Sequence, residues 1–251
     1  VIETATSTDR RKETGVTQNQ DWKLLYRIGA IAALVAVVVF RRNFGAEVSL
    51  FTGIEAIPQS AAEWYTLLQS DPFVGLSFLA VFDLFNYVLV GVLFLALGVA
   101  FWRTHKNLMV LALAGGLVGI AINLASNISL SMFSLSQQYA AAASEAQKAA
   151  LLTAGQALLA TNNPLATFRG TGTYMSVLLI ALAGLLFSLT MLRSNRATAI
   201  VGLLASACDL AYCLTAAFAP SIRALWSASA GLFWVIWHLL VARILFKCAK
   251  E

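Results

Sequence analysis

Charged residues are scarce in this sequence. Only 12% of the 251 residues are charged, against 59% that are hydrophobic, whereas soluble globular domains carry about 25% charged residues. This imbalance excludes an ordinary water-soluble domain as the bulk of the chain. The net charge of +5 is small, and the basic residues follow the ends of the apolar segments instead of forming a patch. Nucleic acid is therefore not an expected partner.

The motifs of the common enzyme classes are missing as well. The sequence contains no phosphate-binding loop, no HExxH, no CxxC, no GxSxG and no GxGxxG. Its three cysteines are Cys208 and Cys213, within one apolar segment, and Cys248, just past another. These positions favour packing residues over disulfides. The sequence therefore predicts no enzyme, no resident cofactor and no metal site.

Long apolar segments are what the chain has instead. Six of them are each about long enough to cross the ~30 Å hydrocarbon core of a bilayer as a helix. They run roughly over residues 24–40, 73–101, 108–133, 173–192, 197–218 and 225–246. We therefore expect an all-α, polytopic membrane protein in which residues 24–251 form one six-helix transmembrane domain in contact with lipid. Residues 1–23 are polar and resemble no secretory signal, so we expect a flexible cytoplasmic tail.

The distribution of Lys and Arg predicts the orientation of the spans. If the N-terminus is cytoplasmic, most of the 17 basic residues fall in inside segments, and Glu47, Glu55, Glu63, Asp71 and Glu145 fall outside. The pair Arg41-Arg42 is the one conflict. We expect a multi-pass protein of the cell membrane, the inner membrane in a bacterium, with both termini in the cytoplasm.

Two connections on the predicted outer side are long. In the first, Ser60-Ala-Ala-Glu63 matches a capping box and predicts a short amphipathic helix that lies flat on the bilayer before span two. The second, from Ser134 to Gly172, is strong helix-forming sequence but too polar to span. We expect it to continue span three past the membrane, or to form a bent helical hairpin over the outer surface. Such a long connection is either functional or a plain cap.

Polar side chains within the spans are the site candidates, since a carboxylate at mid-bilayer costs at least ~2.5 kcal/mol. Asp83 and Asp209 each lie about ten residues from a predicted helix end, hence near the middle of the membrane. The full set of intramembrane candidates is Asp83, Asn86, Tyr87, Asn123, Asn127, Asp209 and Tyr212. They form either a proton or cation site, or hydrogen bonds that hold neighbouring helices together.

His238, near the predicted cytoplasmic end of span six, is a separate candidate. A membrane haem held from both sides needs two opposed histidines, and the only other one, His105, lies in a turn. A single histidine still leaves open one ligand to a pigment or cofactor. The alternative is an interfacial histidine beside Trp237 and Arg243.

Three segments resemble a group of uncharacterised bacterial membrane proteins that share a domain of unknown function, family 4386. These segments are Phe82–Gly91, Ala125–Ala140 and Glu145–Leu152. The resemblance extends from about Phe73 to Tyr212. It implies a bacterial membrane protein of about six helices with a helical outer loop, and it implies no activity.

Three functions follow from these observations. The missing catalytic motifs and the lack of a soluble domain favour an accessory or structural subunit of a larger membrane complex, with other membrane subunits as partners. Asp83 and Asp209 leave open a small proton- or cation-coupled transporter. His238 leaves open a cofactor- or pigment-binding subunit. The accessory subunit is the preferred prediction at this level.

Overall fold

The computed structural model of the protein describes residues 22–39, 58–166 and 169–251, and these contain helices and turns but no strand. Six helical segments are long and apolar enough to cross a membrane. They are Trp22–Val39, α5 (Val81–Phe101), α6 (Lys106–Ser126) with its continuation α7 (Ser129–Ala141), α9 (Thr171–Met191), α10 (Arg196–Phe218) and α11 (Arg223–Cys248). The protein is thus a multi-pass integral membrane protein. Large apolar side chains exposed along these helices provide the surface for lipid.

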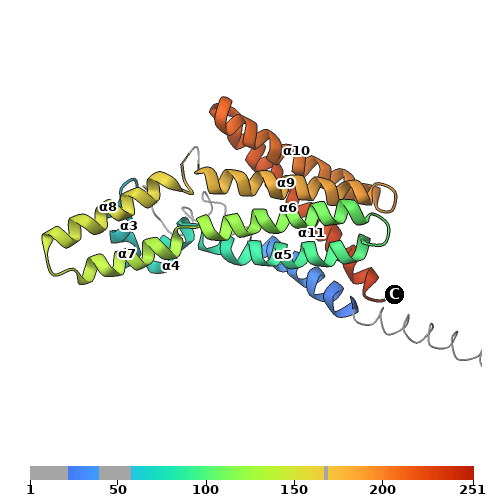
Figure 1. The fold of residues 1–251 in the computed structure, drawn as a ribbon, viewed down its shortest axis with the longest axis horizontal. Helices are drawn as coiled ribbons and strands as arrows, with labels where there is room; N and C mark the ends of the chain where they lie inside the picture. The colour runs from blue at the N-terminus through green and yellow to red at the C-terminus, as the bar shows by residue number, and fades with distance from the viewer. Residues whose placement is uncertain (1–21, 40–57, 167–168) are drawn as a thin grey trace, which may run out of the picture.

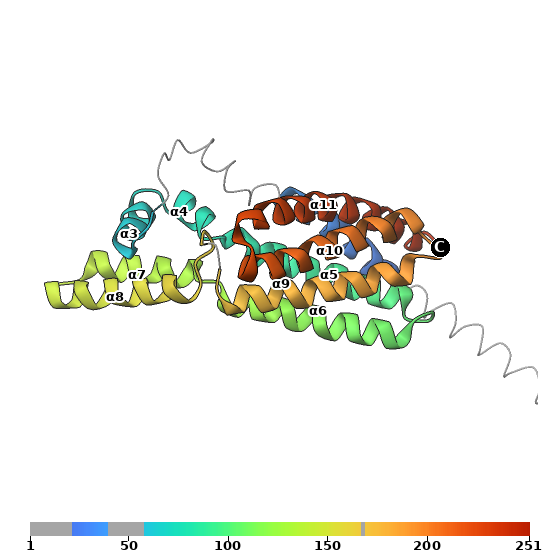
Figure 2. The ribbon, with the colours of Figure 1, turned by 90° about the horizontal axis from the view of Figure 1, so that it is seen from above.

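Four helices form a cap at one end of the bundle (Figures 1 and 2). They are α3 (Ala61–Ser70), α4 (Pro72–Phe78), α7 and α8 (Glu145–Thr161). The hairpin of α7 and α8 extends the line of α6 and α9, while α3 and α4 lie across it (Figure 2). The cap has its own hydrophobic core, separate from the core of the bundle. Both alternatives predicted for this connection are present together: α7 continues the line of α6, and it forms a helical hairpin with α8.

Close backbone contacts hold the bundle together. A Cβ on Gly119 of α6 would lie 3.0 Å from the side chain of Ile180 on α9, so these two helices meet at the glycine. Across the next interface, the rings of Phe94 on α5 and Phe187 on α9 have centroids 4.9 Å apart. Helix α9 also packs along α10, and α10 along α11. This arrangement brings α5, α9, α10 and α11 around one interior space.

The cap helix α3 confirms the predicted capping box but not the predicted location. The Ser60 side chain accepts a hydrogen bond from the Glu63 amide at 3.3 Å, and the Gln59 amide donates to the Glu63 carboxylate at 2.7 Å. The Gln59 amide and the Ser60 hydroxyl, which donates to the Glu63 carboxylate at 3.1 Å, lower the pKa of Glu63. The apolar face of α3 was expected on the bilayer surface. Instead Trp64 and Leu68 are fully buried in the cap core, because α7 and α8 supply a protein surface for them.

Two predicted spans have different bounds in the structure. The segment expected to begin span two is the separate helix α4, and the chain turns at Ala80, whose φ is 63°, before α5 begins at Val81. Span three is interrupted at Asn127 and continues as α7. The combined 36 residues would extend roughly 54 Å at 1.5 Å per residue, so α7 leaves the ~30 Å hydrocarbon core.

The other spans agree with the prediction, and the short basic turns that join them lie at one end of the bundle. The short turns at Arg103–His105 and Arg193–Asn195 lie at the end of the bundle opposite to the cap, as does the C-terminus (Figure 1). The start of helix Trp22–Val39 lies there too, because Gly29 packs against Ala96 and Leu245. The predicted tail, except for its last two residues, and the pair Arg41-Arg42 lie outside the described residues.

Candidate functional site

The bundle contains a cavity of about 390 Å³ at the end nearest the cap. Its walls come from α5, α9, α10 and α11, and its rim comes from the end of α4 and the loop that follows α8. On α5 the lining runs from Asp83 to Phe94, a depth of roughly 16 Å at the helical rise per residue. The cavity therefore reaches from the cap well into the bundle.

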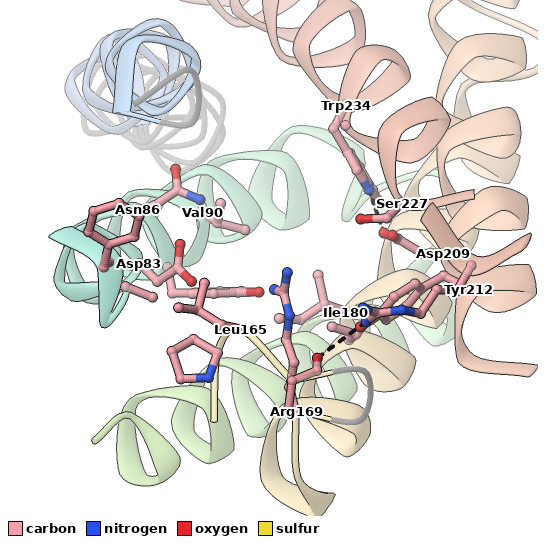
Figure 3. Close-up of a pocket in the computed structure, with 18 of the residues that line it drawn as sticks. Asp83, Asn86, Val90, Leu165, Arg169, Ile180, Asp209, Tyr212, Ser227 and Trp234 are labelled. Carbon is pink, nitrogen blue, oxygen red and sulfur yellow. Dashed lines mark hydrogen bonds between the residues drawn. The ribbon is translucent and has the colours of Figure 1, made fainter. Parts of the chain in front are cut away.

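Both aspartates singled out by the sequence line this cavity, at different depths. Asp209 of α10 lies well inside the bundle, and one of its carboxylate oxygens accepts a hydrogen bond from the Trp234 indole nitrogen at 2.6 Å (Figure 3). Asp83 was expected near the middle of its span and is not there. It lies in the first turn of α5, because the span begins at Val81 and not at Phe73.

Arg169 projects into the space between these two acids (Figure 3). It lies in the loop between α8 and α9 and interacts electrostatically with Asp83. The next residue, Gly170, has a φ of 101°, and a Cβ there would overlap with the carbonyl oxygen of Thr161. Glycine at this position thus permits the tight turn into α9 that aims Arg169 at the cavity.

The two tyrosines predicted as site residues also line the cavity. Tyr87 lies one turn after Asp83 on α5 and interacts electrostatically with both aspartates and with Arg169. Tyr212 lies three residues after Asp209 on α10. The sequence spacing therefore placed each tyrosine on the same side of its helix as the neighbouring acid.

Two buried polar side chains in the lining have an atom without a partner. Asn86 is 8% exposed, and its Oδ1 has no hydrogen bond within the described residues. His238 is 9% exposed, its Nδ1 lies 2.7 Å from the carbonyl oxygen of Trp234, and its Nε2 has no partner in the same part of the chain. The interfacial interpretation of His238 is wrong, since α11 directs the ring into the bundle. A ligand bound in the cavity would supply the hydrogen bonds that these buried atoms lack.

Asn123 and Asn127 lie outside the cavity. Asn123 is buried in α6. Asn127 stands at the break between α6 and α7, where its Nδ2 donates to the Ala80 carbonyl at 3.0 Å and its Oδ1 accepts from the Ser129 amide at 3.0 Å. It therefore joins the two breaks in the chain, which agrees with the predicted role of holding helices together.

Three lining residues were missed by the sequence reasoning. Arg169 and Arg223 are basic residues on the predicted outer side, where basic residues are few. Their departure from the usual distribution of Lys and Arg could have marked them as site candidates. Trp234 was not among the candidates, although it stands well inside a span. Arg223 donates a hydrogen bond to the Ala166 carbonyl at 3.3 Å and so supports the loop at the rim.

The chemistry of the site follows from this lining. Within the described residues, no three His, Cys, Asp or Glu side chains come together in a way that holds a metal ion. Two carboxylates, two guanidinium groups and four aromatic rings with polar atoms, counting the His238 imidazole, face one space of small-molecule size. The arrangement is suited to binding a small polar solute by charge and hydrogen bonds.

Comparison with known proteins adds no assignment to this site. No protein-family model matches the chain, and neither the curated proteins nor the solved structures contain a match. The resemblance to the uncharacterised bacterial family stays a prediction.

Proposed function

We propose that this protein is a small membrane carrier, proton- or cation-coupled, whose solute site is the cavity between Asp83 and Asp209. One observation carries the proposal: acids from two helices that are distant in sequence line the same cavity, within the bundle and beside its cap. If they had faced separate helix contacts, a shared site would have been implausible.

The cost of burying a carboxylate within the membrane favours function over packing for Asp209. An ionisable side chain within a membrane costs about 2.5–3.5 kcal/mol at the helix centre on insertion scales, so such residues mark solute pathways or proton relays more often than ordinary packing. Asp209 lies deep enough for this cost to apply, and within the described residues its carboxylate has a single neutral donor, Trp234 Nε1. A salt bridge that would neutralise it is absent from the described part of the chain.

An accessory or structural role is the competing hypothesis from the sequence. It explains the membrane helices but gives no reason for a polar cavity, because a packing subunit gains nothing from unpartnered buried atoms such as Asn86 Oδ1. Binding a cofactor through His238 places the ligand in the same cavity. The carrier accounts for more of the lining than either alternative.

We also propose that the termini and the basic short turns face the cytoplasm and that the cap faces outward. The excess of Lys and Arg at the end opposite to the cap supports this orientation. A membrane-impermeant maleimide applied to intact cells should label Ala146→Cys, in the cap hairpin, and should not label Ser194→Cys, in a short turn. The reverse pattern would invert the orientation.

Transport currents test the proposed function. Purified protein in liposomes on a solid-supported membrane is exposed to pulses of amines, amino acids, sugars and inorganic cations. We expect a current for at least one of these classes, and its loss in Asp83→Asn and in Asp209→Asn. Glu251→Gln is the matched control, because it makes the same acid-to-amide change on an exposed side chain at the opposite end.

Two results would contradict the carrier. The first is no current from any class with protein that is shown to be folded and inserted. The second is a current that both aspartate variants retain at the wild-type level.

A further inference from the structure

The guanidinium group of Arg169 lies in the cavity between the two acids (Figure 3). We propose that this guanidinium group occupies the position that the cationic group of the solute takes when the solute is bound. The solute is then a small organic cation, a primary amine or a guanidinium compound, that binds between Asp83 and Asp209. This inference rests on the proposed function for the use of the cavity as a solute site, and it adds the chemical class of the solute.

Arg169 has few contacts to hold it. Its side chain is exposed, and no hydrogen bond or ion pair within the described residues fixes its guanidinium group. Arg223 differs, because its guanidinium donates to the Ala166 carbonyl at the rim. A guanidinium group carries five N–H donors and normally satisfies several of them in a carboxylate-rich site. A group without such bonds is one that an incoming cation can displace.

Several hydrogen-bond acceptors line the cavity. The Trp234 carbonyl can only accept, so His238 Nδ1 carries the proton in that contact and the neutral ring presents Nε2 as an acceptor. Asn86 Oδ1 is a second acceptor without a partner within the described residues. The carboxylate of Asp209 lies in the same lining. An ammonium or guanidinium group supplies only donors and complements this set.

Aromatic rings complete the complement to a cation. Tyr87, Tyr212 and Trp234 come from three different helices and line the same space. The faces of such rings attract cations through their quadrupoles, and more strongly when the cation leaves water. A cavity of about 390 Å³ lies in the size range of small-molecule sites.

Arg169 then acts as a competitor that is part of the chain. A charged group that the chain itself places in the site competes at an effective concentration in the mM range, and its positive charge repels a second cation nearby. Removing the charge should therefore strengthen the binding of a free cation, whereas replacing it with another cation should not.

The test is calorimetric titration of the purified full-length protein in detergent with methylguanidinium chloride. We expect Arg169→Gln to bind about ten-fold more tightly than the wild type, as removal of one like charge at close range implies. Arg169→Lys should remain near the wild type. Asp209→Asn added to Arg169→Gln should abolish the binding. Arg193→Gln, an exposed arginine in a short turn at the opposite end, is the control and should bind as the wild type does.

Weaker or unchanged methylguanidinium binding in Arg169→Gln would overturn the inference. Tighter binding of acetate by the wild type than by Arg169→Gln would do so too, because Arg169 would then hold a carboxylate of the solute. If currents appear for another class of solute while no variant binds methylguanidinium, only the solute class is wrong. If methylguanidinium binds as expected but no transport current is found, the proposed cation-binding site stands and the proposed carrier function is wrong.

Discussion

The contact between α3 and α8 makes the sharpest stability prediction. Tyr65 is fully buried, and its hydroxyl donates to the Leu151 carbonyl at 2.8 Å. A Cβ on Gly155 would overlap with that hydroxyl and would lie 2.8 Å from the ring carbon Cζ and 3.1 Å from the Ala61 side chain. The Tyr65 ring cannot turn away easily, because it also packs against Tyr139 at a centroid distance of 5.4 Å. Gly155→Ala should therefore loosen the cap.

The magnitude follows from three contributions. Overpacking a filled core costs about 1–3 kcal/mol, and losing the hydrogen bond of the Tyr65 hydroxyl costs about 1 kcal/mol. Alanine regains about 1 kcal/mol over glycine within a helix. The net loss for Gly155→Ala is about 2 kcal/mol, which corresponds to roughly a 30-fold change in an equilibrium constant.

Amide hydrogen exchange read by mass spectrometry is the appropriate assay, because it reports on the cap separately from the bundle. Peptides from α3 should exchange about 30-fold faster in Gly155→Ala, and peptides from α9 should be unchanged.

Gly115→Ala is the matched control for this prediction, since a Cβ on Gly115 meets nothing within 4 Å. It should leave exchange in α3 unaltered. Tyr65→Leu removes the ring that clashes with the new side chain. In a protein that already carries Tyr65→Leu, Gly155→Ala should therefore cost little stability. Equal behaviour of the two glycine variants in the wild-type background would refute the packing argument.

Three further predictions concern the junction and the cap. Asn127→Ala removes the hydrogen bond from Asn127 to the Ala80 carbonyl and should destabilise the protein by about 1 kcal/mol in thermal unfolding, because the contact across the junction is lost while the carbonyl keeps the Asp83 amide as a donor. Gly170→Ala places a side chain against the Thr161 carbonyl at a φ of 101° and should lower the melting temperature more than Gly115→Ala does. The pKa of Glu63 is lowered in the folded state, so its capping contribution is complete above the ordinary value of about 4.5 and is lost as the pH falls through the folded value. The protection of the α3 amides, expressed relative to intrinsic exchange at each pH, should accordingly fall below about pH 4.5 in the wild type and not in Glu63→Gln.

Local sequence was sufficient for most of the helices. The spans that became α9, α10 and α11 were predicted within two residues at each end, because an apolar segment in lipid must satisfy its backbone hydrogen bonds internally. The capping box at Ser60 was predicted for a similar local reason. The break at Ala80 was missed, since no glycine or proline marks it. Its left-handed conformation is accompanied by a hydrogen bond from Asn127, 47 residues away in the chain.

The candidate site was predicted only in part. Asp83, Asp209 and their neighbouring tyrosines were recognised because acids are rare within apolar segments. That they line the same cavity did not follow from spacing, because α5 and α10 are not consecutive. Arg169 was counted as an ordinary loop charge, and only the turn at Gly170 directs it between the acids.

By itself the sequence determined the membrane class of the protein, the number of its spans and the identity of its rare polar residues, because these depend on the composition of continuous segments. The tertiary structure decided where two spans break, what covers the apolar face of α3 and which polar side chains meet. Each of these depends on contacts between residues far apart in the chain, such as Asn127 with Ala80, Tyr65 with Gly155 and Trp234 with Asp209. Local hydropathy carries no information about such pairs, since it is the same whichever helix becomes the neighbour.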